Sequence, residues 1–129
     1  MAGVFGEEHV ALGDDYLARL LSDDGFWVVA AWSDGNLVGG ITAHALPMTR
    51  SESYELFVYD IAVLPKHQRQ GFGQELMRSL RTEAGLTGIT TVFVAADDED
   101  VHALDFYRTL GGTASSVTMF SFGFMDASS

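Results

Sequence analysis

A short loop with two glycines has the composition and the setting of a phosphate-binding site. The loop, Gln68-Arg69-Gln70-Gly71-Phe72-Gly73, separates a strand-like run over residues 57–63 from a helix-like run that starts at Gln74. Backbone N–H groups at a helix N-terminus have no acceptor within the helix, and the helix dipole favours an anion there. Glycines let a pyrophosphate approach the backbone, because no Cβ stands in the way. The loop predicts a phosphorylated ligand, with an ordinary glycine-rich loop as the alternative.

Asp60 is the strongest candidate for acid–base chemistry. It stands among apolar neighbours in the strand-like run, and an unpaired charge buried there would be costly. A carboxylate beside an attacking amine can accept the proton that the amine must lose, directly or through a water. The alternative is a structural aspartate that is paired with a cation or with backbone N–H groups.

Glu55 is a second acid in the same run. Side chains alternate along a regular strand, so Glu55 and Asp60 would face opposite sides of a sheet. Both can line one pocket only if a β-bulge lies between them, and we expect such a bulge. Without the bulge, Glu55 would be a solvated surface residue.

A run of four acids, Asp97, Asp98, Glu99 and Asp100, follows the next predicted strand. Ligands of parallel α/β sheets bind at the carboxyl ends of the strands, which is where this run lies. Its mutual repulsion suits a ligand with several ammonium groups. The alternatives are a solvated acidic loop, a helix cap formed by Asp100, and a Ca²⁺ site, for which the EF-hand spacing is absent.

The elements that must position these residues can be predicted from their apolar periodicity. Gly39-Gly40 within a strand predicts a bulge or a close approach of two backbones. The segment 57–96 has the strand–helix–strand form, so its strands should be parallel and joined by a right-handed crossover. The sequence therefore predicts a single mixed α/β domain over residues 1–129. The expected elements are a helix over residues 16–21 capped by Asp14 or Asp15, a hairpin of strands 26–32 and 37–46, a strand 54–64, a helix 74–84, a strand 90–96, a helix over 103–110 and a strand 117–124.

Composition limits the classes of function. The net charge of −11 argues against nucleic-acid binding, which needs a basic surface. The negative charge either attracts cationic ligands or only keeps the protein in solution. The absence of cysteine excludes disulfides, thiolate metal sites and a cysteine nucleophile. The four histidines show no metal-ligand pairing, so we expect no metal, and no Ser-His-Asp set supports acyl-enzyme chemistry. No apolar run is long enough for a membrane span and residues 1–8 do not form a secretory signal, so we expect a cytoplasmic protein.

The pattern Gln68-x-x-Gly71-x-Gly73 after a strand resembles the acyl-CoA signature of the GCN5-related N-acetyltransferases (GNAT). The resemblance runs from about Tyr16 to Phe124. It is closest to the aminoglycoside 3-N-acetyltransferases of the small GNAT type. The residues that carry this closer resemblance are Asp15-Tyr16-Leu17, Leu37-Val38-Gly39, Leu46-Pro47, Tyr59-Asp60-Ile61-Ala62-Val63, Arg69-Gln70-Gly71, Ala96-Asp97, Asp100, Tyr107 and Leu110-Gly111.

The resemblance implies an enzyme that moves an acetyl group from acetyl-CoA to an amine of an aminoglycoside antibiotic, at the 3-amino group, and so confers resistance. It implies direct attack by the amine with both substrates bound. It also implies a mixed sheet with splayed parallel strands and flanking helices, here without the family's first strand, since the chain would begin within the family's first helix. The alternatives are a GNAT enzyme for another cationic amine, such as a polyamine, and a non-catalytic acyl-CoA-binding module.

The resemblance also assigns roles to residues. Asp60 would be the base and Tyr107 would protonate the departing thiolate, although a tyrosine on an apolar helix face is most often core. The backbone of Ile61, Ala62 and Val63 would bind the pantetheine arm between the splayed strands, with backbone near Val94 and Ala95. The pyrophosphate would lie on Gln68, Arg69, Gln70, Gly71, Phe72, Gly73 and Gln74, and the acceptor on Glu55, Asp60, Asp97, Asp98 and Asp100.

Phe120, Phe122 and Phe124 alternate along the last predicted strand. The apolar face that they would form is either internal core or a contact with a second subunit. Dimers are frequent in the resembled family, so we expect a homodimer.

Overall fold

The computed structural model describes residues 13–123, and the chain divides into two compact units between Ala95 and Ala96. The expectation that the chain begins within the first helix of the family concerns residues that lie outside the described range. Phe124 also lies outside it.

The elements of the first unit are α2 (Asp14–Leu21), β1 (Phe26–Ser33), β2 (Asn36–Pro47), β3 (Tyr54–Val63), the short 3₁₀ helix η1 (Pro65–His67), α3 (Phe72–Leu86) and β4 (Thr91–Val94). The second unit contains α4 (Val101–Thr109).

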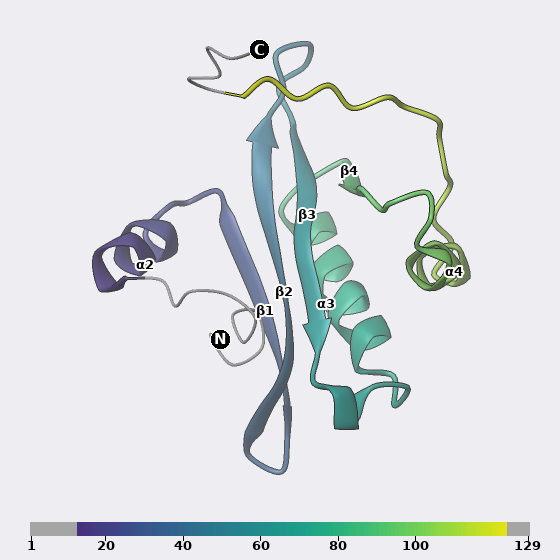
Figure 1. The fold of residues 1–129 in the computed structure, drawn as a ribbon. Coiled ribbons are helices and arrows are strands. Elements are labelled where there is room, and N and C mark those ends of the chain that lie inside the picture. The colour runs from purple at the N-terminus through teal and green to yellow at the C-terminus, as the bar shows by residue number, and fades with distance from the viewer. Residues whose placement is uncertain (1–12, 124–129) are drawn as a thin grey trace. The chain divides into compact units, whose positions relative to one another are not determined.

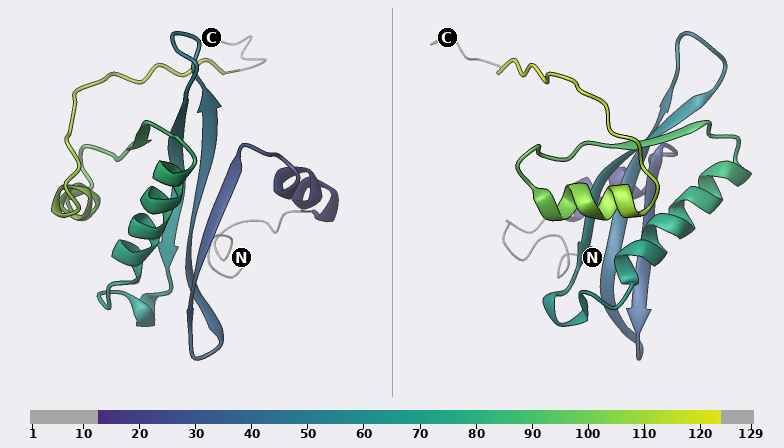
Figure 2. Two further views of the ribbon diagram at one scale, coloured as in Figure 1. Left: turned by 180° about the vertical axis from the view of Figure 1, so that it is seen from behind. Right: turned by 90° about the vertical axis from the view of Figure 1, so that its right-hand side faces the viewer.

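The four strands form one mixed sheet in the order β1-β2-β3-β4. The pairs β1–β2 and β2–β3 are antiparallel, and β3 runs parallel to β4. The parallel pair confirms the strand–helix–strand unit that the sequence predicts, with α3 as the crossover. Figure 1 shows the strands side by side, and Figure 2 shows α3 lying along one face of the sheet.

The core lies between α3 and the face of the sheet that it covers, because both elements present an apolar side there. In α3 the residues Leu76, Leu80 and Ala84 recur at intervals of four, which places them on one side of a helix. Burying this stripe against aliphatic strand residues removes apolar surface from water and is the main stabilising term for the unit. The buried apolar residues are Val38, Ile41, Ala43, Leu56, Val58, Leu76, Met77, Leu80 and Ala84.

The glycine pair in β2 confirms the predicted close approach. A Cβ on Gly39 would lie 2.9 Å from the carbonyl oxygen of Ala62 in β3. Only glycine therefore permits the two backbones to come together at this point. A register shift in the β1–β2 ladder lies beside it, where Val38 is the extra residue of β2 between the pairs Ala31–Gly39 and Trp32–Leu37.

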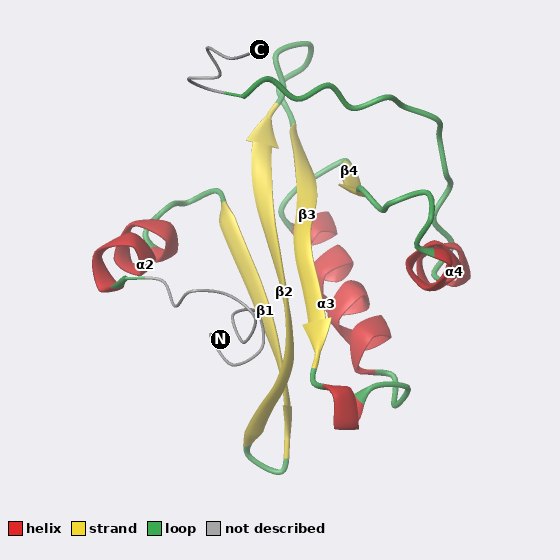
Figure 3. Cartoon of the chain, in the orientation of Figure 1, coloured by secondary structure: helices red, strands yellow, loops and turns green. Residues whose placement is uncertain are grey.

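Two sequence predictions are wrong in detail. The strand expected over residues 117–124 is not formed in the described part, where residues 117–123 are irregular and exposed (Figure 3). Alternating phenylalanines make a strand only when another strand pairs with them, and none among residues 13–123 pairs with this segment. Asp14 and Asp15 do not cap α2. They lie in its first turn after Gly13, where their charges still favour the helix dipole.

None of the helices within residues 13–123 combines the length and the apolar composition that a membrane crossing needs.

Candidate functional site

A β-bulge interrupts β3 at Tyr59. Asp60 pairs with Thr42 of β2, whereas Ala43, the next residue of β2, pairs with Val58. Tyr59 is therefore an extra residue that pairs with no residue of β2. The bulge lies between Glu55 and Asp60, which confirms the prediction made from the two acids.

The register shows which side chains share a face, because directly opposite residues point to the same side of a sheet. Glu55 is opposite Leu46, and Asp60 is opposite Thr42. Leu46 and Thr42 are four residues apart in β2, so they lie on one face. Glu55 and Asp60 consequently lie on the same face of the sheet. It is the face opposite the one on which Val58 is buried.

Asp60 is exposed in the described chain, and Glu55 is partly exposed. The expectation that Asp60 is a buried charge is therefore wrong. The bulge moves Tyr59 and Asp60 out of the alternation that buries Leu56 and Val58. An exposed carboxylate avoids the cost of desolvation and can be reached by a cationic ligand.

The strands β3 and β4 separate next to the bulge. Their parallel pairing runs from Glu55–Thr91 to Val58–Val94 and stops there. Beyond this point, residues 60–63 of β3 pair with β2 alone within the described sheet. Backbone groups of Ile61 and its neighbours on the β4 side thus form a strand edge, to which an extended ligand can add main-chain hydrogen bonds. The splayed strands that the sequence predicts are confirmed.

The loop after β3 is held by a backbone hydrogen bond to the sheet and by hydrogen bonds from its own side chains. The Leu64 N–H donates to the Val38 carbonyl at 2.8 Å, which fixes the loop to the sheet. The side-chain amides of two glutamines donate to backbone carbonyls, Gln68 to Val63 at 3.0 Å and Gln70 to Lys66 at 3.2 Å. These two amides therefore shape the loop, so an anion would be bound chiefly by backbone N–H groups.

The N-terminus of α3 has the features of an anion site. Gly71 is its N-cap residue, with φ of 90°, a left-handed conformation that favours glycine. No side chain in the described chain caps this end. The first intrahelical bond runs from the Glu75 N–H to the Gly71 carbonyl at 3.0 Å. The N–H groups of the first turn before Glu75 are thus the donors that α-helix geometry leaves unsatisfied. These donors, the open space around Gly71 and the charge of Arg69 fit a pyrophosphate.

His67 packs against the start of α3. Its ring packs edge to face against Phe72 with the centroids 6.1 Å apart. Its Nδ1 atom is buried and has no hydrogen-bond partner within the described chain. The packing connects η1 to the first turn of α3.

The acidic run in the second unit is exposed and partly used for local structure. Asp97 accepts a hydrogen bond from the Glu99 N–H at 2.8 Å, and Asp100 accepts one from the Ala103 N–H at 3.0 Å. Asp100 therefore caps α4, as one of the alternatives predicted. In residues 13–123, no three His, Asp or Glu side chains are grouped so that they could hold a metal ion.

Tyr107 is partly buried in α4, where its ring meets that of Phe106 at 5.2 Å. Burial raises the pKa of the Tyr107 hydroxyl above its ordinary value, and the negative charge of Asp100 raises it further. Tyr107 is therefore protonated throughout the neutral range and can act as a proton donor.

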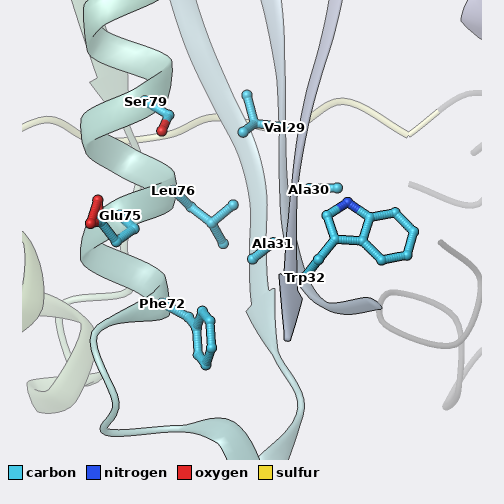
Figure 4. A pocket seen from close by; sticks show the side chains of 8 residues that line it. All are labelled: Val29, Ala30, Ala31, Trp32, Phe72, Glu75, Leu76 and Ser79. Atoms are coloured by element: carbon cyan, nitrogen blue, oxygen red, sulfur yellow. The ribbon is translucent and has the colours of Figure 1, made fainter. Parts of the chain in front are cut away.

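A separate depression of about 220 Å³ lies between β1 and α3, on the sheet face that α3 covers (Figure 4). Glu55 and Asp60 lie on the other face, so this depression is separate from the acceptor site that they would form, and Phe72 is the one predicted site residue that lines it. It is lined by Val29, Ala30, Ala31, Trp32, Phe72, Glu75, Leu76 and Ser79.

The sequence reasoning missed the aromatic side chains that share a face with Asp60. They come from all four strands, and only the register between strands brings them together. The signal available in the sequence was at least one aromatic residue or histidine in each strand, with two of the five in β3. These residues are Phe26, His44, Phe57, Tyr59 and Phe93.

Comparisons with known proteins agree with this architecture. The model of the acetyltransferase (GNAT) family matches residues 3–111. The chain is similar to the aminoglycoside acetyltransferase HMB0005 from an uncultured soil metagenomic sample, with 32% identity, a TM-score of 0.83, and coverage of 89% of this chain and 76% of that chain. It is also similar to the aminoglycoside acetyltransferase meta-AAC0020 from an uncultured soil metagenomic sample, solved in complex with sisomicin. Here the identity is 30%, the TM-score 0.85, and the coverage 94% of this chain and 80% of that chain.

A more distant similarity shows the fold alone. The structure of AAC(6')-Iy with a bisubstrate analog of CoA is 18% identical, with a TM-score of 0.78 and coverage of 95% of this chain and 86% of that chain. No curated protein matches the sequence. The family model spans most of the chain, and two solved acetyltransferases of 30% identity or more also match over most of their length: the chain belongs to the GNAT acetyltransferase family.

Proposed function

We propose that this acetyltransferase moves an acetyl group from acetyl-CoA to an amine of an aminoglycoside, at its 3-amino group, in a complex that holds both substrates. The observation that carries the proposal is the position of Asp60. It is exposed on β3 at the point where β3 and β4 separate, on the same face as Glu55.

The first unit has the groups that would hold coenzyme A. The first turn of α3 and Arg69 would bind the pyrophosphate, through uncapped N–H groups and a fixed positive charge. The free edge of β3 at Ile61, Ala62 and Val63 would bind the pantetheine arm through its backbone. GNAT enzymes use acetyl-CoA, which supplies the acetyl group as an activated thioester.

Asp60 would act as the general base. The acceptor amine attacks the thioester carbonyl as its neutral form, since an ammonium group has no lone pair to donate. Asp60 takes the proton that the amine loses, directly or through a water, while the carbon–sulfur bond breaks. A positioned base of this kind contributes about 100- to 10,000-fold to the rate.

Tyr107 would return a proton to the sulfur that leaves. Its raised pKa keeps the hydroxyl protonated at neutral pH, as a proton donor must be. A thiolate leaves readily without help, so this contribution should be smaller than that of Asp60.

The acceptor class is supported by charge and by the relatives. Aminoglycosides carry several ammonium groups, and the chain has a net charge of −11. Glu55 would bind one of those groups on the face that carries Asp60. Asp97, Asp98 and Asp100 of the second unit would bind others. Two similar proteins are aminoglycoside acetyltransferases at 30% identity or more, and one of them is complexed with sisomicin.

The proposal is tested by an acetyl-transfer assay that follows the release of free CoA thiol. Aminoglycosides with and without a free 3-amino group are compared with spermidine and with a buffer blank. We expect turnover only with acceptors that have the free 3-amino group. Turnover with spermidine alone would replace the acceptor by a polyamine. Binding of acetyl-CoA without turnover of any amine would favour a non-catalytic acyl-CoA-binding module.

A further inference from the structure

A row of five rings crosses the sheet from β1 to β4. The ring of Phe26 lies 5.4 Å from that of His44, and His44 lies 5.9 Å from Tyr59, measured between centroids. Tyr59 lies 6.2 Å from Phe57, and Phe57 lies 5.0 Å from Phe93. All four separations are in the range of interacting aromatic pairs. We call these five residues the aromatic row.

The aromatic row lies on the face that carries Asp60 and Glu55. Phe26 is opposite His44, His44 is opposite Phe57, and Phe57 is opposite Phe93. Opposite residues share a face. His44 is two residues from Thr42 in β2, so it lies on the same face as Thr42 and as Asp60, the partner of Thr42. The row and the two carboxylates are therefore parts of one surface of the first unit.

The row is not a closed hydrophobic core in the described chain. Tyr59 is 65% exposed and Phe93 is 39% exposed. Tyr59 is the extra residue of the bulge, and it directly precedes Asp60. Its ring meets His44 at 85° and Phe57 at 74°, so it has two nearly perpendicular ring neighbours. A large, exposed ring thus lies next to the carboxylate in the chain.

We propose that the aromatic row receives one aminosugar ring of the acceptor, and that Tyr59 is a specificity-determining residue for it. This inference rests on the proposed function. A sugar ring has an apolar C–H side that can pack on an aromatic face, and its ammonium groups are attracted by the negative face of the ring. Asp60 and Glu55 supply the charge complement on the same surface. No other exposed aromatic of the sheet combines this support with a neighbouring carboxylate within the described residues.

Three variants at one position separate the parts of this interaction. Tyr59→Phe keeps the ring, Tyr59→Leu keeps an apolar side chain without a ring, and Tyr59→Ala removes both. We expect the KM for the aminoglycoside to rise about tenfold in Tyr59→Leu and at least as much in Tyr59→Ala. In Tyr59→Phe it should stay within about twofold, because the ring face is retained. The KM for acetyl-CoA should not follow this order.

Tyr54→Leu is the matched control. Tyr54 is a tyrosine of the same strand with 51% exposure, but it has no ring contact within the described chain and lies at the far end of β3. This control should leave both KM values unchanged. Equal acceptor KM values for Tyr59→Leu and Tyr59→Phe, with an active enzyme, would overturn the role of Tyr59 and the aromatic row in binding the sugar ring and would leave the proposed function unaffected.

A second measurement tests whether the row is instead covered by another part of the protein or by a second copy. In that case Tyr59→Leu, which remains apolar, would retain activity, while Tyr59→Ala would unfold at lower denaturant or change the oligomeric state. This pattern would overturn the inference. A protein that acetylates no aminoglycoside at all would overturn the proposed function first, and with it the role of the aromatic row.

Discussion

Glu55 and Asp60 lie on the same face of β3 although five positions separate them along the strand. In a regular strand an odd separation places two side chains on opposite faces. The extra residue Tyr59 removes this parity and turns both carboxylates away from the core. The same bulge coincides with the end of the β3–β4 pairing at Val58–Val94. One local irregularity therefore exposes the acids and opens the strand edge together.

Replacing Asp60 by asparagine should separate catalysis from binding. The amide has nearly the same shape but cannot accept the proton of the amine. We expect kcat/KM to fall by about 100- to 10,000-fold, the range for loss of a general base. Acetyl-CoA should still bind in calorimetry, because its proposed contacts are at other residues.

Glu55→Gln is the matched control for the Asp60 variant. It removes one negative charge from the same face and leaves Asp60 in place. We expect a higher KM for the acceptor and little change in kcat. A kcat loss in Glu55→Gln as large as that in Asp60→Asn would show that the base assignment is wrong.

Deleting Tyr59 should close the opening between β3 and β4. Without the extra residue, the ladder continues from Val58 to Asp60, and β4 can pair further along β3. The strand edge proposed for the pantetheine arm is then occupied. Loss of two main-chain hydrogen bonds, at about 1 kcal/mol each, corresponds to a Kd for acetyl-CoA that is roughly 30-fold higher.

Tyr59→Ala serves as the comparison for this deletion, since it keeps the bulge and removes only the ring. It should bind acetyl-CoA like the unaltered chain in calorimetry. An unchanged Kd in the deletion variant, with circular dichroism showing a folded chain, would refute a role of the bulge in opening the site.

Much of the first unit could be predicted from local patterns. Two glycines between a strand pattern and a helix pattern located the loop, and the parity of Glu55 and Asp60 indicated the bulge. Both inferences depend on residues close together in the sequence. The exposure of Asp60 was not predicted, because its apolar neighbours Val58 and Ile61 point to the opposite face of the sheet once Tyr59 is extra.

Features that depend on partners distant in sequence were missed. The aromatic row needs the register of three strand pairs, which no single segment specifies. The segment 117–123 shows the opposite case, where a strand-like pattern has no partner in the described sheet. There Val117, Phe120 and Phe122 are more than 70% exposed, so alternation alone did not decide the structure.

Gly71→Ala should weaken both the fold and the binding of acetyl-CoA. The φ of 90° is left-handed, which costs a residue with a Cβ about 1–2 kcal/mol. A lower free energy of unfolding by this amount is expected in chemical denaturation. A Cβ at the N-cap also stands where a pyrophosphate would approach, so the Kd for acetyl-CoA should rise.

Gly85→Ala in the same helix is the matched control. A Cβ would meet no atom within 4 Å at either glycine, so the two sites differ in backbone conformation and not in space. Gly85 lies within α3, where alanine is favoured over glycine by about 0.5–1 kcal/mol. We expect Gly85→Ala to stabilise the protein and to leave acetyl-CoA binding unchanged. Stabilisation by Gly71→Ala would contradict the left-handed conformation.

Tyr107 should ionise at higher pH than an exposed tyrosine. Its pKa is raised by burial and then by Asp100. Because the folded state holds this proton more tightly than the unfolded state, the contribution of Tyr107 to stability is present below pH about 10 and is lost as the pH rises through the folded-state pKa. Denaturation of Tyr107→Phe should show less of this alkaline loss. The same variant should reduce kcat by about tenfold or less, as expected for a proton donor to a good leaving group.

The charge of Asp100 can be removed without losing its role as a helix cap, since asparagine caps a helix about as well as aspartate. Asp100→Asn should therefore lower the pKa of Tyr107 towards the ordinary value, because a negative charge near the phenolate is removed. The change is measured as an earlier tyrosinate absorbance in an alkaline titration, with Tyr107→Phe used to assign the signal. An unchanged titration would show that burial alone sets this pKa. A Tyr107 that ionises below an exposed tyrosine would exclude it as the proton donor at neutral pH.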